Sequence, residues 1–323
     1  MIDSSADAWC VTSDTLKEQV RMAKSVAMTV AGKSDPASRV SMASVLDALR
    51  ETAGNTEFSD YSDSASRGRT MTDTSALLGL VSRGRADIAV LEAGELPLKF
   101  SGKLEIGAVL QRGNPFNVII SDEEMILDDL PAGISIAVGD PGLKGQILSY
   151  RDDIDLVDRD EDYAGLRELL DRGEIGGFVA RAWEVELLGR QDEVVEVFTS
   201  SICMPPAGQG AVVLIIRSGD RNAAAAVRQI SHPASLSEVM LERMLLGAVS
   251  RDGKGGIGVL AEFDEDEFGL SAAIVSPDGS MKIVSEEQGW KGDELKVVKS
   301  LVEDLLEKGG EEIIEMYRNI PEE

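Results

Sequence analysis

Residues 204–217, MPPAGQGAVVLIIR, form the stretch that decides the fold. Pro205, Pro206, Gly208 and Gly210 predict a turn, and the apolar run AVVLII directly after them predicts a buried strand. Because this strand follows a long unit of different pattern, we expect the chain to cross back here into the domain in which it began.

The N-terminal part of the chain alternates helical and extended patterns. TLKEQVRMAKSVAMTVA (15–31) and TDTSALLGLVSRGR (72–85) place apolar residues at helical spacing, and ADIAVLE (86–92) is typical of a buried strand. Between the two helical segments, SDYSDSASRGRT is polar and predicts a loop. With the crossover strand, these patterns predict a first α/β domain made of residues 1–103 and 199–219.

Two further units follow from the remaining patterns. In residues 104–198, the short runs EIGAVLQ, NVII and GISIAVGD alternate with helical stretches such as DYAGLRELLDRG, which predicts a second α/β domain. In residues 220–323, the helical SLSEVMLERMLLGAV precedes the strand-like IGVLAEF, LSAAIVS and MKIVS. This last unit is predicted to be a smaller α+β domain.

Composition and charge narrow the class of partner. The formal charge of -26 disfavours nucleic acid and anionic membranes, so neither is an expected partner. The acidic start MIDSSADAWC lacks the features of a signal peptide, and no apolar run is long enough to span a membrane, so we expect a cytoplasmic protein. Two cysteines and one histidine do not form the spacing of a metal site, so no metal is expected. We also expect the protein to be a monomer.

Several segments, in order and spacing, resemble the porphobilinogen deaminase (hydroxymethylbilane synthase) family. They are GRADIAV (84–90), QRGNPFNVII (111–120), the decisive stretch 204–217, HPASLSEVMLER (232–243) and GIGVLAE (256–262). Enzymes of that family are transferases of tetrapyrrole biosynthesis that join porphobilinogens head to tail into hydroxymethylbilane. The resemblance implies two periplasmic-binding-protein-like α/β domains around a cleft that holds a small molecule, with a third domain whose loop faces that cleft.

The resemblance also locates the catalytic and cofactor positions. Family enzymes hold a dipyrromethane cofactor through a cysteine, and the aligned stretch RDGKGGIGVLAE places Gly253 at that position. Covalent attachment is therefore predicted lost, and dipyrromethane is expected only if it is held without a covalent bond. In DIAVLEAGELP, Glu95 stands at the position of the family's catalytic aspartate and Gly94 replaces a lysine.

The family binds the carboxylates of its substrate with arginine and lysine, and this chain keeps few of those cations. In GDPGLKGQ, Lys144 remains, Gly145 replaces an arginine and Asp140 adds a negative charge. In RDEDYAGL, Arg159 remains beside Asp160, Glu161 and Asp162, while Gly165 replaces an arginine. The predicted substrate-binding residues are Lys144, Arg159 and two arginines of the polar loop, Arg67 and Arg69.

A third basic segment of the family has also changed. ARAWEVELLG carries Glu184 and Glu186 in place of basic residues, and Arg181 is the nearby cation that offers compensation. Three functions stay open: a working synthase with Glu95 as acid, a diverged paralogue that binds a neutral or cationic ligand or a partner without catalysis, and another enzyme in which the acids at 140 and 160–162 bind a divalent cation. Loss of the cations favours a diverged paralogue with weak or no deaminase activity.

Overall fold

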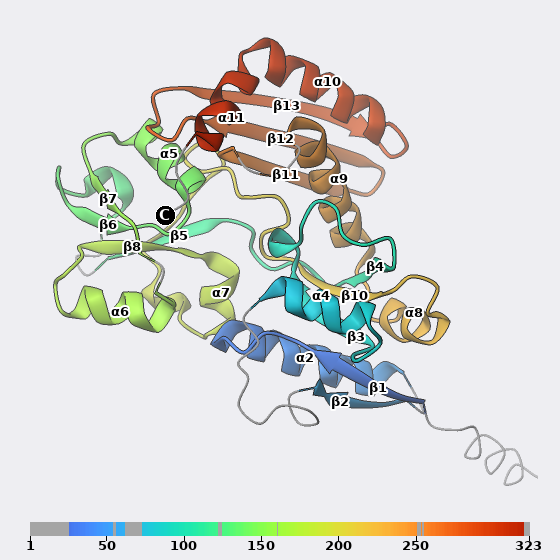
Figure 1. The fold of residues 1–323 in the computed structure, drawn as a ribbon. Helices are drawn as coiled ribbons and strands as arrows, with labels where there is room; N and C mark the ends of the chain where they lie inside the picture. Colours follow the sequence, from blue (N-terminus) through green and yellow to red (C-terminus); the bar gives the residue numbers. More distant parts are fainter. Residues whose placement is uncertain are drawn as a thin grey trace, which may run out of the picture.

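The described residues form three sheets, and each sheet is the centre of one unit of the chain (Figure 1). The structure is a computed structural model, and it describes residues 26–53, 56–61, 73–121, 125–159, 161–250, 253 and 255–319. Two units are five-stranded α/β domains, and the third is a three-stranded sheet with helices packed on it. The predicted fold class, two α/β domains with a smaller α+β domain, is confirmed.

The first sheet has the order β2-β1-β3-β10-β4. β1, β2 and β3 run parallel, and β10 lies antiparallel between β3 and β4. Residues 213–216 of β10 are fully buried, which explains the unbroken apolar run of the decisive stretch. The elements are β1 (Val26–Ala31), α2 (Pro36–Thr52), β2 (Thr56–Asp60), α4 (Thr74–Ser82), β3 (Ile88–Glu92), β4 (Leu104–Val109), β10 (Val212–Arg217) and α8 (Arg221–Arg228).

Two details of the first domain correct the sequence predictions. Residues 26–31 are predicted to be helical but form the strand β1, because Met28 and Val30 are buried between the neighbouring strands and the helix α2. Residues 104–109 are predicted to begin the second domain but form β4, which pairs with β10 at the edge of the first sheet. By sheet membership, the chain leaves the first domain after residue 109.

The second sheet has the order β7-β6-β8-β5-β9, with helices on both faces. β5 and β8 pair antiparallel, and β6 runs parallel to β7 and β8. The elements are β5 (Asn117–Ser121), β6 (Ser135–Ala137), α5 (Pro141–Tyr150), β7 (Asp155–Val157), α6 (Tyr163–Asp171), β8 (Gly177–Arg181), α7 (Ala182–Leu187) and β9 (Glu196–Val197).

The third unit is an antiparallel meander, β11-β12-β13, covered by helices that share its apolar core. Its elements are α9 (Pro233–Val249), β11 (Ile257–Asp264), β12 (Glu267–Val275), β13 (Lys282–Trp290), α10 (Glu294–Glu307) and α11 (Gly310–Arg318). Within the part of the chain that the structure describes, no helix combines the length and the apolar character needed to cross a membrane.

A buried ion pair ties the three units together. Glu242 of α9 is fully buried and accepts two hydrogen bonds from the Arg112 guanidinium, at 2.6 and 3.2 Å. The same carboxylate accepts from the backbone N–H groups of Gly208 at 2.6 Å and Ala261 at 2.9 Å. Arg112 Nε donates to the carbonyl of Gln209. The connection between the first two domains, the turn before β10 and the third domain therefore meet at one carboxylate.

Candidate functional site

A cleft between the first two domains is the main concave feature of the site. One cavity of about 520 Å³ extends between these domains, and a second of about 460 Å³ extends toward the loop of the third domain. Gly94, Asn117, Asp140, Leu143 and Pro206 line both cavities, so the two adjoin. We call the larger cavity the main cleft and the other the side cavity.

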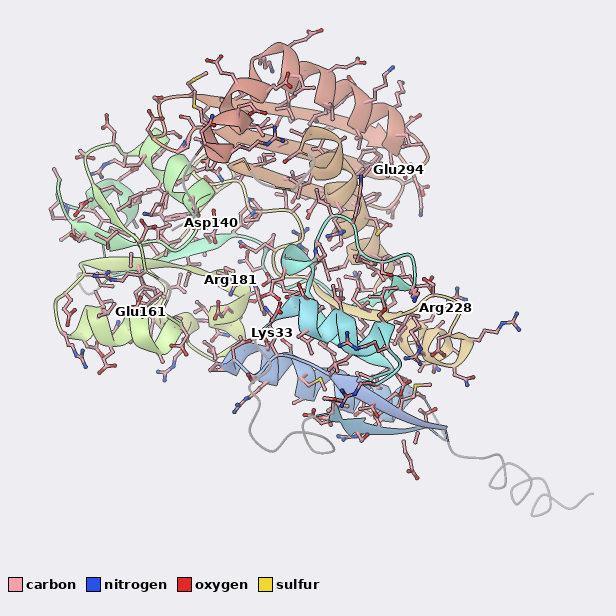
Figure 2. The ribbon with its side chains drawn as sticks, in the orientation of Figure 1. Lys33, Asp140, Glu161, Arg181, Arg228 and Glu294 are labelled. Atoms are coloured by element: carbon pink, nitrogen blue, oxygen red, sulfur yellow. The ribbon has the colours of Figure 1, made fainter. Side chains whose placement is uncertain are left out.

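Acidic side chains dominate the main cleft. Among the residues that the structure describes, seven carboxylates line it against two guanidinium groups. Figure 2 labels two of the acids, Asp140 and Glu161, together with Arg181. Such a lining favours cations and repels anions. The seven acids are Asp35, Glu92, Glu95, Asp140, Glu161, Asp162 and Glu184, and the two cations are Arg159 and Arg181.

Three of these acids also cap helices whose N-terminal ends border the cleft. Asp35 Oδ1 accepts from the Ser38 N–H at 2.9 Å, and Asp140 Oδ1 accepts from the Leu143 N–H at 2.7 Å. Asp162 Oδ1 accepts from the Gly165 N–H at 3.0 Å. A helix N-terminus attracts anions through its free N–H groups and dipole. Here aspartates of the chain itself accept hydrogen bonds from these N–H groups. An anionic ligand would therefore meet a negative charge at the N-terminus of each of the three helices.

Glu95 lines the main cleft from a short 3-10 turn, Ala93–Glu95, that follows β3. Its Oε1 forms an ion pair with Lys33 Nζ at 2.7 Å, and its Oε2 is 3.5 Å from Thr74 Oγ1. Its side chain is 31% exposed. The carboxylate therefore faces the cleft, but a lysine of its own domain already neutralises it.

Arg181 is held by acids of both domains. Its guanidinium lies 2.7 Å from Glu92 Oε2 and 3.0 Å from Glu184 Oε2, and it stacks over the Trp183 ring at 5.4 Å. Burial raises the pKa of Glu92, although Arg181 and the N–H of Gly210 oppose that shift. The compensation expected of Arg181 is thus directed to acids of the protein itself.

Gly253 lines the side cavity with a left-handed backbone, at a φ of 77°. A Cβ at this position would lie 3.6 Å from Leu98, so there is space for a side chain, but the backbone conformation disfavours any residue other than glycine. Cys203 lines the same cavity. Its thiol is fully buried, and this burial raises its pKa to about 12, so it is a poor nucleophile.

Comparison with known proteins identifies the family. The model described as "Porphobilinogen deaminase, dipyromethane cofactor binding domain" matches residues 63–225. The porphobilinogen deaminases of Pelotomaculum thermopropionicum and Thermus thermophilus are 32% and 30% identical over 76% and 74% of this chain, and over 78% and 79% of their own lengths. The chain belongs to the porphobilinogen deaminase family. Among solved structures, the BvgS VFT2 domain of Bordetella pertussis is 18% identical with a TM-score of 0.41, covering 68% of this chain and 95% of that one.

The covalent cofactor of a porphobilinogen deaminase does not fit the residues found here. Gly253, which the resemblance aligns with the attachment cysteine, offers no sulfur, and the buried, protonated thiol of Cys203 is no substitute. The side cavity itself is large enough for a ligand. We therefore derive no chemistry through a thioether-bound dipyrromethane.

The structure separates the cations that the sequence predicted to bind substrate. Arg159 lines the main cleft, whereas Lys144 does not, because its ammonium pairs with Asp158. Arg67 and Arg69 lie outside the described residues. Of the four predicted substrate-binding cations, Arg159 is the one placed at the cleft among the described residues.

Gly145, where the resemblance predicts the loss of an arginine, lies at a close contact with the third domain. This glycine of α5 packs against the turn after β12, where a Cβ would clash with the carbonyl oxygen of Ser276 and lie 3.1 Å from the Tyr317 hydroxyl. One turn earlier, a Cβ at Gly142 would lie 2.9 Å from Gly256 Cα. The third domain therefore packs directly on α5 at Gly142 and Gly145.

A divalent cation site is the remaining sequence hypothesis for the acids. The described residues contain no group of three or more histidine, cysteine or acidic side chains arranged to hold a metal ion. Asp160, one of the four acids in that hypothesis, lies outside the described residues. Asp140 and Asp162 cap different helices, which fixes their carboxylates on separate N–H groups.

Sequence reasoning missed two features of the site. Lys33 follows β1 and neutralises Glu95 across 62 residues of chain, and Trp183 packs against the crossover at Gly113. The one available signal for the first was the Asp-Pro pair at 35–36, which marks a helix start directly after Lys33. Pairs so distant in sequence leave no local pattern.

Proposed function

We propose that this chain is a diverged porphobilinogen deaminase-family protein with weak or no deaminase activity, whose cleft binds a neutral or cationic small ligand. The observation that carries the proposal is the lining of the main cleft, where carboxylates outnumber guanidinium groups seven to two among the described residues. Lys33 is already paired with Glu95, and Arg181 of the cleft lining is already paired with Glu92 and Glu184.

The physical argument is one of charge. Each pyrrole unit of the family's substrate carries two carboxylates, and the growing chain accumulates them. Two like charges 8 Å apart repel by roughly 2 kcal/mol at an effective dielectric constant of about 20. Several such pairs, with three helix ends already capped by aspartates, oppose binding of a polycarboxylate more strongly than the two guanidinium groups favour it.

A side-by-side comparison with the Pelotomaculum deaminase tests this proposal. Both proteins are purified, weighed by mass spectrometry, treated with Ehrlich's reagent and assayed with porphobilinogen. For this chain we expect the mass of the bare sequence, no colour and turnover at least a thousandfold slower, about 4 kcal/mol of lost transition-state stabilisation. Turnover equal to that of the relative would refute the proposal.

A second function, residual deaminase activity with a dipyrromethane held without a covalent bond, has one observation in its favour. Glu95 retains a carboxylate facing the cleft at the position of the family's aspartate. In that case a coloured small molecule would separate from the protein on denaturation, and Glu95→Gln would abolish the remaining turnover. Colour that stays absent in native and denatured protein excludes this alternative.

A further inference from the structure

The first two domains do not share a hydrophobic core. Among the described residues, two apolar clusters surround the first sheet and two others surround the second, and no residue belongs to clusters of both sheets. Two segments of chain, 110–116 and 198–211, connect the sheets. Domains joined in this way move relative to each other unless a large apolar interface holds them. Polar contacts across the boundary therefore contribute directly to how far the main cleft opens.

One ion pair between described residues joins the first sheet to the second. Arg181 ends β8 in the second domain, and its Nη1 lies 2.7 Å from Oε2 of Glu92, which ends β3 in the first domain. The Glu92 side chain is 8% exposed, and its Oε1 accepts from the Gly210 N–H at 3.2 Å in the turn before β10. Figure 2 labels Arg181 at this boundary. The carboxylate is thus fixed in place, and the guanidinium reaches it from the other domain.

A second acid holds the same guanidinium from within the second domain. Glu184 of α7 accepts from Arg181 Nε at 3.1 Å, and the same carboxylate oxygen lies 3.0 Å from Nη2. The guanidinium also stacks over the Trp183 ring. Arg181 is therefore oriented by its own domain, and a guanidinium that is already oriented loses little side-chain entropy when it bonds across the boundary.

The interface behind this ion pair is incompletely satisfied. A cavity of about 60 Å³ remains where α2 and α7 contact each other across the boundary (Figure 1). Beside it, Ser41 Oγ of α2 and Trp183 Nε1 of α7 are buried without a hydrogen-bond partner among the described residues. Unsatisfied polar groups disfavour the arrangement that buries them, and water would satisfy both if the domains separated. This cost favours separation of the domains, and the Glu92–Arg181 pair opposes it.

We propose that the Glu92–Arg181 ion pair is a latch between the first two domains: it holds the main cleft narrow, and breaking it lets the domains separate. Both residues line the main cleft, so the latch lies in the wall of the space that it controls. The proposal concerns two side chains of the protein itself and is independent of which ligand the cleft binds.

Spin labels on the full-length protein measure the separation of the two domains. Ser44→Cys on α2 and Glu168→Cys on α6 supply two exposed label sites. Cys10→Ser leaves the fully buried Cys203 as the one native cysteine. Double electron–electron resonance then gives the distance distribution between the labels. In Glu92→Gln, which keeps the shape of the side chain, we expect the mean distance to lengthen by more than about 2 Å and the distribution to broaden.

The other acid on the same guanidinium provides the matched control. Glu184→Gln removes the same charge from the same arginine but leaves the bond to Glu92, so we expect the wild-type distance. Arg181→Met breaks the latch from the other side and should lengthen the distance as Glu92→Gln does. The double variant should open the cleft no further than either single change. Arg181 is 41% exposed, so methionine should be tolerated there.

Two outcomes overturn the inference: the wild-type distance in both Glu92→Gln and Arg181→Met, or an equal lengthening in Glu184→Gln. The first means that the chain connections and the third domain hold the first two domains in place without the ion pair. The second means that the loss of any negative charge from the cleft wall widens the cleft, whether or not the bond across the boundary is kept. Urea denaturation of each variant confirms that the distances belong to folded protein.

Discussion

The buried carboxylate of Glu242 links three parts of the fold through its hydrogen bonds. It is fully buried, and its four hydrogen bonds reach the interdomain connection, the turn before β10 and β11. Glu242→Gln keeps the shape but removes the charge, leaving the guanidinium of Arg112, 6% exposed, without its carboxylate. We expect a loss of about 3 kcal/mol in the free energy of unfolding, measured by urea denaturation.

Glu238 is the matched control for that measurement. It lies one turn earlier on α9, and its carboxylate is 3.9 Å from Arg112 Nη1, beyond hydrogen-bonding range. Glu238→Gln should therefore cost well under about 1 kcal/mol. Equal losses for the two variants would show that the net charge of α9, rather than the hydrogen-bonded pair, determines stability.

Gly253 allows a test of the proposal that this chain does not attach the cofactor, and of whether a thiol at this position would suffice for attachment. Gly253→Cys places a thiol beside the side cavity, at a strain of about 1–2 kcal/mol because the backbone is left-handed. We expect a free thiol that reacts with Ellman's reagent and a protein mass without dipyrromethane, since the cleft stays acidic. The Pelotomaculum deaminase, made in the same host, is the positive control. A mass increment on the variant would mean that the acidic lining does not prevent assembly of the cofactor.

Single positions could be predicted from the sequence where the family pattern fixes them, and not where a distant partner decides their role. Glu95 lines the main cleft and Gly253 lines the cavity that adjoins it, while their roles in catalysis and cofactor attachment stay predictions. The pairing of Glu95 with Lys33 and of Arg112 with Glu242, which is 130 residues away, depends on how the domains fold together. No periodicity or motif encodes such a pair.

At the scale of elements, the contact between α5 and the third domain depends on glycine. Gly145→Ala puts a methyl group against the Ser276 carbonyl, so we expect the third domain to shift and the melting temperature to fall by several degrees. Gly102→Ala, where nothing lies within 4 Å of the added carbon, is the control and should change little. An unchanged melting temperature in Gly145→Ala would mean that the third domain is not held against the helix.

The turn between β12 and β13 provides a prediction on pH. Asp278 accepts from Ser276 Oγ at 2.6 Å, Ser280 Oγ at 2.8 Å and the Ser280 N–H at 3.1 Å. These hydrogen bonds lower the pKa of Asp278 from 3.8 to about 2. A lowered carboxyl pKa contributes stability that is present above the unfolded value of 3.8 and is lost as the pH falls toward 2.

Urea midpoints of the wild type and Asp278→Asn at several pH values measure that contribution. The wild type should be the more stable at pH 6, and the difference should shrink below pH 4 and disappear as the pH falls through about 2. Ser280→Ala removes one of the three hydrogen bonds and should give a smaller difference with the same pH dependence. A gap that stays constant down to pH 2 would assign the effect to turn geometry instead of charge.

Helices and strands could be predicted from the sequence where their hydrophobic pattern is long. The prediction was wrong where contacts with neighbouring strands determine the structure. The apolar run of β10 and the amphipathic helices of the third domain were identified correctly, since burial on one or both faces leaves a strong period. β1 was mistaken for part of a helix because a segment of six residues fits both the helical and the strand periodicity. Only its pairing with the parallel strands β2 and β3 makes it a strand. β4 was assigned to the wrong sheet because its partner β10 lies more than a hundred residues later.

At the scale of the whole molecule, the framework of a porphobilinogen deaminase-family protein surrounds a cleft that is lined mainly by acids. The buried Arg112–Glu242 pair and the turn before β10 hold the domains in place, while seven carboxylates among the described residues line the space between them. Packing and cleft charge involve separate residues, so one can change without the other. It follows that mutation should be able to reverse the charge of the cleft lining without unfolding the protein.

The double variant Glu161→Lys with Glu184→Gln tests that reversal. Both side chains line the main cleft, neither caps a helix through its side chain, and the second change releases Arg181 from one of its two acids. We expect the variant to bind butane-1,2,3,4-tetracarboxylate at least tenfold tighter than the wild type, about 1.4 kcal/mol, by isothermal titration calorimetry. The affinity should fall with added salt, because the gain is electrostatic.

A control of equal net charge separates the cleft from the surface. Glu168→Lys with Glu186→Gln makes the same two kinds of substitution at exposed positions outside the cleft lining, on α6, which begins two residues after Glu161, and on α7, which also carries Glu184. If local charge in the cleft excludes polyanions, this control binds the tetracarboxylate no better than the wild type. If both double variants gain equally, the overall charge of -26 repels the ligand and the cleft has no special part in the selection.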